Sequence, residues 1–160
     1  MTAKNKPYKK KSFESDGSPN DISSNIYRSM VHSHAFKALS NNQKILYVYC
    51  KIGYYGDNKK EIQKRLSGCN NYNQQQINEM FVMNRYKWET EYEIYSNNGQ
   101  FYKDIKALEA FGFVEVVENG KSSRTKTIYR FSDNWQTLAP KHITAIKTQL
   151  KAPKNKEIAV

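Results

Sequence analysis

Residues 100–131 read QFYKDIKALEAFGFVEVVENGKSSRTKTIYRF, and this stretch decides the fold. In its first part, Phe101, Ile105 and Leu108 recur at the intervals of a helix with one inward face. Such spacing places the three side chains above one another on the same side of the helix. The sequence therefore predicts a helix over about 100–110.

The remainder of the stretch predicts a two-stranded hairpin. Gly112 follows the helix as a residue that lets the chain turn away from it. Apolar residues between Val114 and Val117 precede an Asn-Gly pair at 119–120, which is among the strongest local signals for a hairpin. Residues 126–131 then alternate as expected of the return strand.

Two helical segments are expected before this stretch. Residues 26–39 carry apolar side chains at roughly helical intervals. Ser40 is suited to cap the next helix, over about 41–52, because its hydroxyl can accept a backbone N–H. This second helix is apolar around most of its circumference, so we expect it to be the buried spine of the core.

The middle of the chain is more polar. Residues 54–79 contain few apolar side chains and are expected to form a long surface insertion with one helix at 59–66. Residues 81–83 suit a short strand, and Asn84 is suited to cap a helix over 85–92. The order is then helix, strand, helix, turn, helix and hairpin. This order is that of a winged helix-turn-helix, an α+β fold that is mostly helical with a C-terminal β-hairpin wing.

The 160 residues are sufficient for one domain. We expect that domain to span 25–139, between a disordered basic arm at 1–24 and a basic C-terminal tail at 140–160. The first eleven residues hold five lysines and no acid, and the tail holds five lysines against one glutamate. Three residues of the tail are spaced to share one face of a short helix: Ile143, Ile146 and Leu150.

Composition narrows the classes of partner. The net charge is +11 and the isoelectric point is about 9.5, which is typical of proteins that bind nucleic acid. Neither a bilayer-spanning apolar run nor a signal-peptide core is visible, so a cytoplasmic protein without a membrane partner is expected. Without an export signal, Cys50 and Cys69 are expected to be reduced thiols.

The predicted helix at 100–110 and the hairpin carry side chains suited to duplex DNA. A helix fits the B-DNA major groove, which is about 12 Å wide. Polar side chains at the start and on the outward face of the helix are expected to meet bases and phosphates: Asn97, Asn98, Gln100, Tyr102, Lys103 and Lys106. Cations and hydroxyls of the hairpin are expected to contact the backbone: Lys121, Ser122, Ser123, Arg124 and Lys126. Each feature alone is typical of a solvated surface, whereas their combination favours DNA binding.

Several runs resemble winged-helix domains of plasmids, phages and conjugative elements. They are AFKALS at 35–40, KILY at 44–47, QFYKDIKAL at 100–108 with GF at 112–113, and IYRFSD at 128–133. Together they are similar to the N-terminal domain of RepA-type plasmid replication initiators, over about residues 25–135. The insertion at 54–79 departs from the compact pattern, and a complete initiator usually carries a further domain.

The resemblance implies site-specific binding of double-stranded DNA. The chain would then act as a transcription regulator or as a replication or transfer accessory of its own mobile element. A replication or transfer protein is a further candidate partner, and the sequence leaves a homodimer open.

Enzyme and metal functions are not expected. His32 and His34 flank Ser33, and such a pair shares a metal on a strand, whereas a helix turns the two imidazoles about 200° apart. A zinc site that joins them to Cys50 and Cys69 lacks a recognisable ligand spacing. A glycine-rich phosphate loop is also not visible, so we expect no cofactor. The remaining alternative to DNA binding is a protein-binding adaptor or inhibitor built on a winged-helix scaffold.

Overall fold

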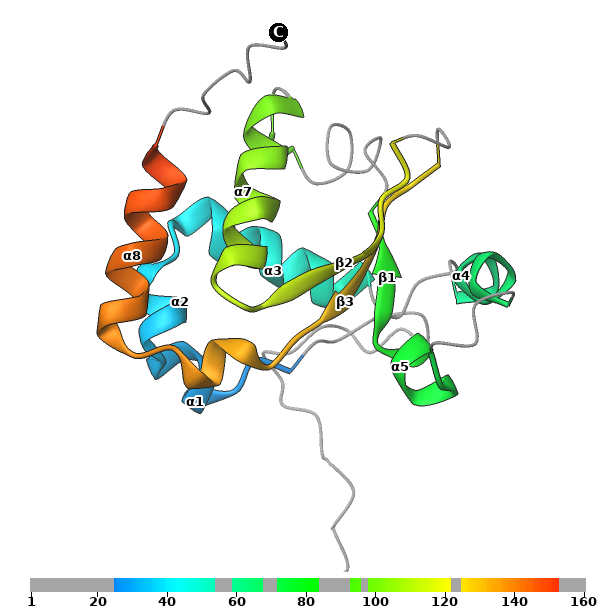
Figure 1. The fold of residues 1–160 in the computed structure, drawn as a ribbon, viewed down its shortest axis with the longest axis horizontal. Helices are drawn as coiled ribbons and strands as arrows, with labels where there is room; N and C mark the ends of the chain where they lie inside the picture. Colours follow the sequence, from blue (N-terminus) through cyan, green and yellow to red (C-terminus); the bar gives the residue numbers. More distant parts are fainter. Residues whose placement is uncertain are drawn as a thin grey trace, which may run out of the picture.

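The computed structural model describes residues 25–53, 59–67, 72–83, 93–95, 98–121 and 125–152 (Figure 1). Its fold belongs to the α+β class and is mostly helical, with a three-stranded antiparallel sheet. The helices are α1 (Arg28–His32), α2 (His34–Ala38), α3 (Asn41–Gly53), α4 (Lys59–Leu66), α5 (Gln74–Asn78), α7 (Asn98–Ala110) and α8 (Pro140–Lys151), with a 3-10 helix, η1, at Asn134–Thr137. The strands are β1 (Met80–Val82), β2 (Val114–Glu118) and β3 (Ile128–Phe131).

The first helical segment is broken at Ser33. The hydroxyl of Ser33 donates to the carbonyl of Met30 at 2.7 Å and accepts from the N–H of Phe36 at 3.1 Å. One side chain thus binds the end of α1 and caps α2, while its own backbone is extended. The prediction of a single helix over 26–39 is therefore wrong, because this local hydrogen bonding competes with the helical ladder.

The cap predicted for α3 is confirmed. Ser40 accepts the N–H of Gln43 through its hydroxyl at 3.3 Å, and Gln43 in return accepts the N–H of Ser40 at 2.9 Å. Leu46, Tyr47 and Cys50 face the core. Ile45 is 45% exposed, whereas the other positions between Gln43 and Gly53 are buried or half-buried, so α3 is covered around most of its circumference as predicted.

The junction between α7 and β2 follows the sequence pattern. Ile105 and Leu108 are buried, and Gly112 turns the chain with a positive φ of 73°. A Cβ at this position would lie 2.7 Å from the backbone nitrogen of Trp135, so only glycine fits here without a shift. The helix at 100–110 and the hairpin after it are thus confirmed, although β3 begins at Ile128 and not at 126.

The sheet has the order β1-β3-β2, and both of its faces are covered. Phe81 on β1 pairs with Tyr129 on β3, and both side chains belong to the main core with α3 and α7. The neighbouring residues of β1, Met80 and Val82, point to the opposite face and belong to a second apolar cluster.

The second cluster changes the interpretation of residues 54–79. Ile62 and Leu66 of α4 are buried in this cluster against Met80, Val82 and Ile128 of the sheet. In Figure 1, α4 lies beside β1, at the end of the sheet away from α8. The described part of 54–79 is therefore not a surface insertion but a second layer of the fold. Ile62 and Leu66 are one helical turn apart, which is the signal that a count of apolar residues misses.

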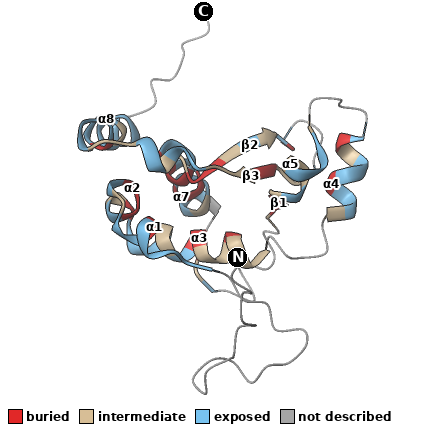
Figure 2. Cartoon of the chain, turned by 90° about the horizontal axis from the view of Figure 1, so that it is seen from below, coloured by how far each residue is buried: buried red, intermediate tan, exposed pale blue. Residues whose placement is uncertain are grey.

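The region expected to be a basic tail begins with a helix. Ile143 of α8 is buried, Ile146 is half-buried and Leu150 is 42% exposed, and α8 packs against α2 (Figure 2). The short helix that the sequence left open is thus present. The predicted arm at 1–24 and the predicted helix at 85–92 lie outside the described residues. Among the helices of the described segments, none has the length and apolar character that a bilayer crossing requires.

Candidate nucleic-acid interface

One face of α7 is open to solvent. Most of its exposed positions recur at helical spacing, opposite the buried face of the same helix, and Gln100 in the first turn is exposed as well: Gly99, Gln100, Tyr102, Lys103, Lys106, Glu109 and Ala110. The aromatic side chain of Tyr102 is 56% exposed. The structure therefore brings three of the predicted site residues, Tyr102, Lys103 and Lys106, together on one stripe.

Gln100 belongs to a different set of contacts. Its side-chain amide donates to Oδ1 of Asp104 at 3.2 Å. Gln43 of α3 donates to the same oxygen at 3.0 Å, and the hydroxyl of Tyr95 donates to Oδ2 at 2.9 Å. Gln100 is thus exposed, as the sequence predicts, and its amide also donates to Asp104.

Asp104 is the residue that sequence reasoning missed. It is 2% exposed. On α7 it lies between Lys103, which belongs to the open stripe, and Ile105, which lines the core. Three neutral donors from three parts of the chain satisfy its oxygens, as a buried polar group requires. Burial and the hydrogen bond to Asp104 raise the pKa of the Tyr95 phenol well above its ordinary value, so this donor keeps its proton. The network fixes the first turns of α7 to α3.

The hairpin that follows α7 is closed by a backbone hydrogen bond between its arms and by a side-chain contact in its turn. The N–H of Thr125 donates to the carbonyl of Gly120 at 2.9 Å, and the N–H of Lys121 donates to Oδ1 of Asn119 at 3.0 Å. A Cβ on Gly120 would lie 2.1 Å from the carbonyl oxygen of Thr125, so the two arms approach too closely for a larger residue. Lys121 is exposed at this end of the hairpin.

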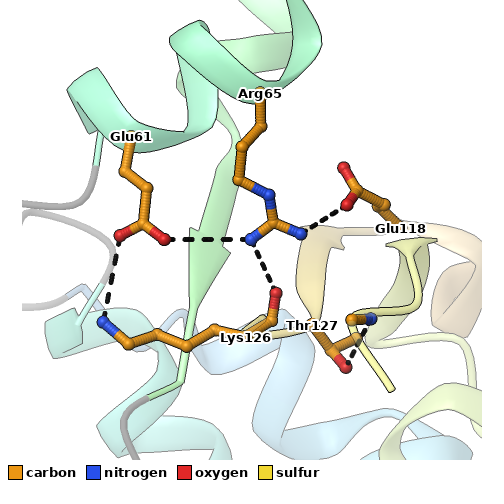
Figure 3. Close-up of polar contacts among 6 residues, drawn as sticks. Glu61, Arg65, Glu118, Lys126 and Thr127 are labelled. Atoms are coloured by element: carbon orange, nitrogen blue, oxygen red, sulfur yellow. Dashed lines mark hydrogen bonds and ion pairs between the residues drawn. The ribbon is translucent and has the colours of Figure 1, made fainter. Parts of the chain in front are cut away.

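Lys126 lies at the base of the hairpin and faces α4 (Figure 3). Its ammonium is 3.9 Å from Oε2 of Glu61, and its carbonyl accepts a hydrogen bond from Arg65 at 2.7 Å. The sequence indicated a hairpin without an acid after Glu118. The structure adds Glu61 from α4, so the charge of Lys126 is partly balanced.

The remaining predicted residues are only partly placed. Asn98 begins α7, but its side chain is not described. Asn97, Ser122, Ser123 and Arg124 lie outside the described residues.

The elements on either side of α7, which are α8 and the hairpin, also carry lysines. In Figures 1 and 2, α7 lies between α8 and the sheet from which the hairpin extends. In Figure 1 the first turn of α7 and the far end of the hairpin both point to the upper edge of the molecule. Residues 140–152 of α8 and its C-cap contain three lysines and no acid. Such an arrangement attracts a polyanion at long range.

The described residues provide no metal centre. They contain no cluster of three or more histidine, cysteine or acidic side chains that could hold a metal ion. His32 and His34 are exposed on either side of the break at Ser33. Cys50 is a free, buried thiol, 3.8 Å from the sulfur of Met83, and burial raises its pKa, which disfavours a reactive thiolate.

Comparison with known proteins identifies no relative of this chain. No protein-family model matches it, and no match was found among curated proteins or among solved structures.

Proposed function

We propose that this chain is a winged-helix protein that binds double-stranded DNA, with α7 in the major groove and the hairpin on the neighbouring backbone. The observation that carries the proposal is that α7, on which Tyr102, Lys103 and Lys106 are exposed, leads directly into the hairpin of β2 and β3. The resemblance of the sequence suggests a regulator, or a replication or transfer accessory, of a plasmid, phage or conjugative element.

The topology supports the winged-helix part of the proposal. In the described chain, α3 precedes β1, α7 leads through Gly112 into β2, and β3 returns to the centre of the sheet. The helix that would enter DNA is thus followed at once by the strand pair that would form the wing. This connection fixes the angle between the two through the buried residues of α7 and the sheet.

The open stripe supplies the chemistry. Lysine donates to the O6 and N7 acceptors of guanine or to phosphate, and the tyrosine hydroxyl can donate or accept. We therefore assign direct contacts to Tyr102, Lys103 and Lys106, and backbone contacts to Lys121. Gln100 acts through Asp104 and positions the helix.

Substitutions that each remove one positive charge test the proposal. Lys103→Gln and Lys106→Gln should each weaken binding to duplex DNA about tenfold, because each removes one contact to base or phosphate. Lys37→Gln on α2 is the matched control, since it removes the same charge from an exposed position of another helix. Affinities are measured by fluorescence anisotropy with a pool of random-sequence duplexes, and then with a duplex selected from that pool.

Equal effects of all three substitutions would contradict the placement on α7. An absence of DNA binding in the unmodified protein would contradict the function itself and would favour the protein-binding alternative on the same scaffold.

A further inference from the structure

One arginine bridges both arms of the hairpin at its base (Figure 3). Arg65, in the last turn of α4, donates from one guanidinium nitrogen to the carbonyl of Lys126 at 2.7 Å. Its other terminal nitrogen binds Oε1 of Glu118 at 2.5 Å. Glu118 is the last residue of β2, and Lys126 precedes β3 by two positions. Arg65 therefore holds the two arms together where the strand ladder ends.

The hairpin needs such support at this point. The pairing of β2 with β3 shifts between Val116 and Glu118, so the ladder is irregular before it stops. Beyond it, the N–H of Thr125 donates to the carbonyl of Gly120 at 2.9 Å, and the N–H of Gly120 donates to Oγ1 of Thr127 at 3.4 Å. Val117, at the irregularity, is half-buried and packs against the second apolar cluster, which includes Ile62 of α4. The hairpin base thus contacts α4 through both an apolar and a charged side chain.

Arg65 itself is anchored to a fixed body. Its side chain is 16% exposed, and Glu61 lies one turn earlier at 3.9 Å. At the other end of α4, the ammonium of Lys59 donates to the carbonyls of Asn78 at 2.6 Å and Met80 at 2.5 Å. These contacts join α4 to the beginning of β1. An arginine on this helix is therefore fixed to the sheet independently of the end of the hairpin beyond β2 and β3.

We infer that Arg65 is a positioning residue that holds the end of the hairpin, beyond β2 and β3, in a fixed direction relative to the sheet, so that Lys121 is pre-organised for its partner. The planar guanidinium matches the geometry because it presents separate N–H groups to a carbonyl and to a carboxylate at once. A lysine has the same charge but a single nitrogen, so it cannot span both acceptors in the same way. The identity of the partner rests on the proposed function, whereas the positioning of the hairpin does not.

Amide hydrogen exchange in the unliganded protein tests the inference. Arg65→Gln and Arg65→Lys should raise the exchange rate of the Thr125 amide about tenfold, because a charge-assisted contact across the hairpin base is lost. The amide of Phe113, which donates to Leu108 at 2.9 Å in the main core, should keep its rate. Lys64→Gln is the matched control, because it removes one positive charge from an exposed position of the same helix.

Two results would overturn the inference. An unchanged rate at Thr125 would show that Arg65 does not hold the hairpin. An equal rise at Thr125 and Phe113 would show that Arg65 stabilises the whole fold and not the hairpin in particular.

Binding to the random-sequence duplex pool separates this inference from the proposed function. If both are right, Arg65→Gln weakens binding more than Lys64→Gln does. If the unmodified protein does not bind DNA, the proposed function fails, and the exchange experiment still decides whether Arg65 positions the hairpin.

Discussion

Asp104 is a single residue whose structural role the sequence does not predict. The spacing of Phe101, Ile105 and Leu108 predicts the inward face of α7 correctly. Asp104 is adjacent in sequence to Ile105 and shares that face. The sequence does not show, however, which donors would bind a buried carboxylate at this position. The hydrogen bond to Gln43 joins positions 61 residues apart, so no local pattern contains it.

Removal of the buried carboxylate should be costly. Asp104→Ala leaves the donors of Gln43, Tyr95 and Gln100 without their acceptor, and we expect a loss of about 3 kcal/mol in the free energy of unfolding. Urea denaturation checks this value. Glu109→Ala, on the exposed face of the same helix, is the control and should change stability by less than about 0.5 kcal/mol. Equal effects would contradict the role of the network.

Alkaline pH should destabilise the protein through its buried tyrosines. Burial raises the pKa of Tyr129 to about 12, while the pKa of the phenol in an unfolded chain is about 10. Unfolding between these values releases a proton, so the contribution of Tyr129 is complete below pH of about 10 and is lost as the pH rises towards 12. Tyr129→Phe should make the stability less dependent on pH in this window. Urea midpoints at several pH values measure this dependence of stability on pH. A dependence in the variant equal to that of the unmodified protein would contradict the raised pKa of Tyr129.

At the scale of elements, local signals succeeded where a single pattern decides the structure. The α7 helix, its glycine exit and the hairpin follow from residues within one stretch. The break between α1 and α2 was missed because Ser33 forms side-chain contacts that compete with a continuous apolar pattern. The sequence alone does not decide whether α8 forms, because its apolar stripe is stable as a helix only when α2 packs against it. The sequence does not predict the role of α4, because Ile62 and Leu66 are recognised as core residues only when β1 is known to pack against them.

The second apolar cluster makes α4 part of the folding unit. Ile62 is fully buried in it, so Ile62→Ala should lower the free energy of unfolding by about 3 kcal/mol, through lost burial and the cavity that remains. Thermal and urea unfolding should remain a single transition in this variant. A loss below about 0.5 kcal/mol, the range of surface substitutions, would show that residues 59–66 are an insertion after all.

At the scale of the whole molecule, the fold combines two supports for one proposed surface. The Asp104 network fixes α7 to α3, and Arg65 fixes the hairpin to α4 and β1. Neither support is visible in the sequence, because each joins segments that lie far apart along the chain. The sequence did indicate the net charge of +11 and the neighbouring helix and hairpin. Composition and local order thus predict the kind of surface, while long-range contacts determine how rigidly it is presented.

The salt dependence of DNA binding tests the central claim most directly. We expect the stripe of α7 and the hairpin together to neutralise about six phosphates. A plot of the logarithm of the binding constant against the logarithm of salt concentration should then have a slope of about −5. Lys103→Gln should reduce the magnitude of this slope by about 1, whereas Lys37→Gln should leave it unchanged. A binding constant that does not vary with salt, or an equal change in slope for both variants, would contradict the account.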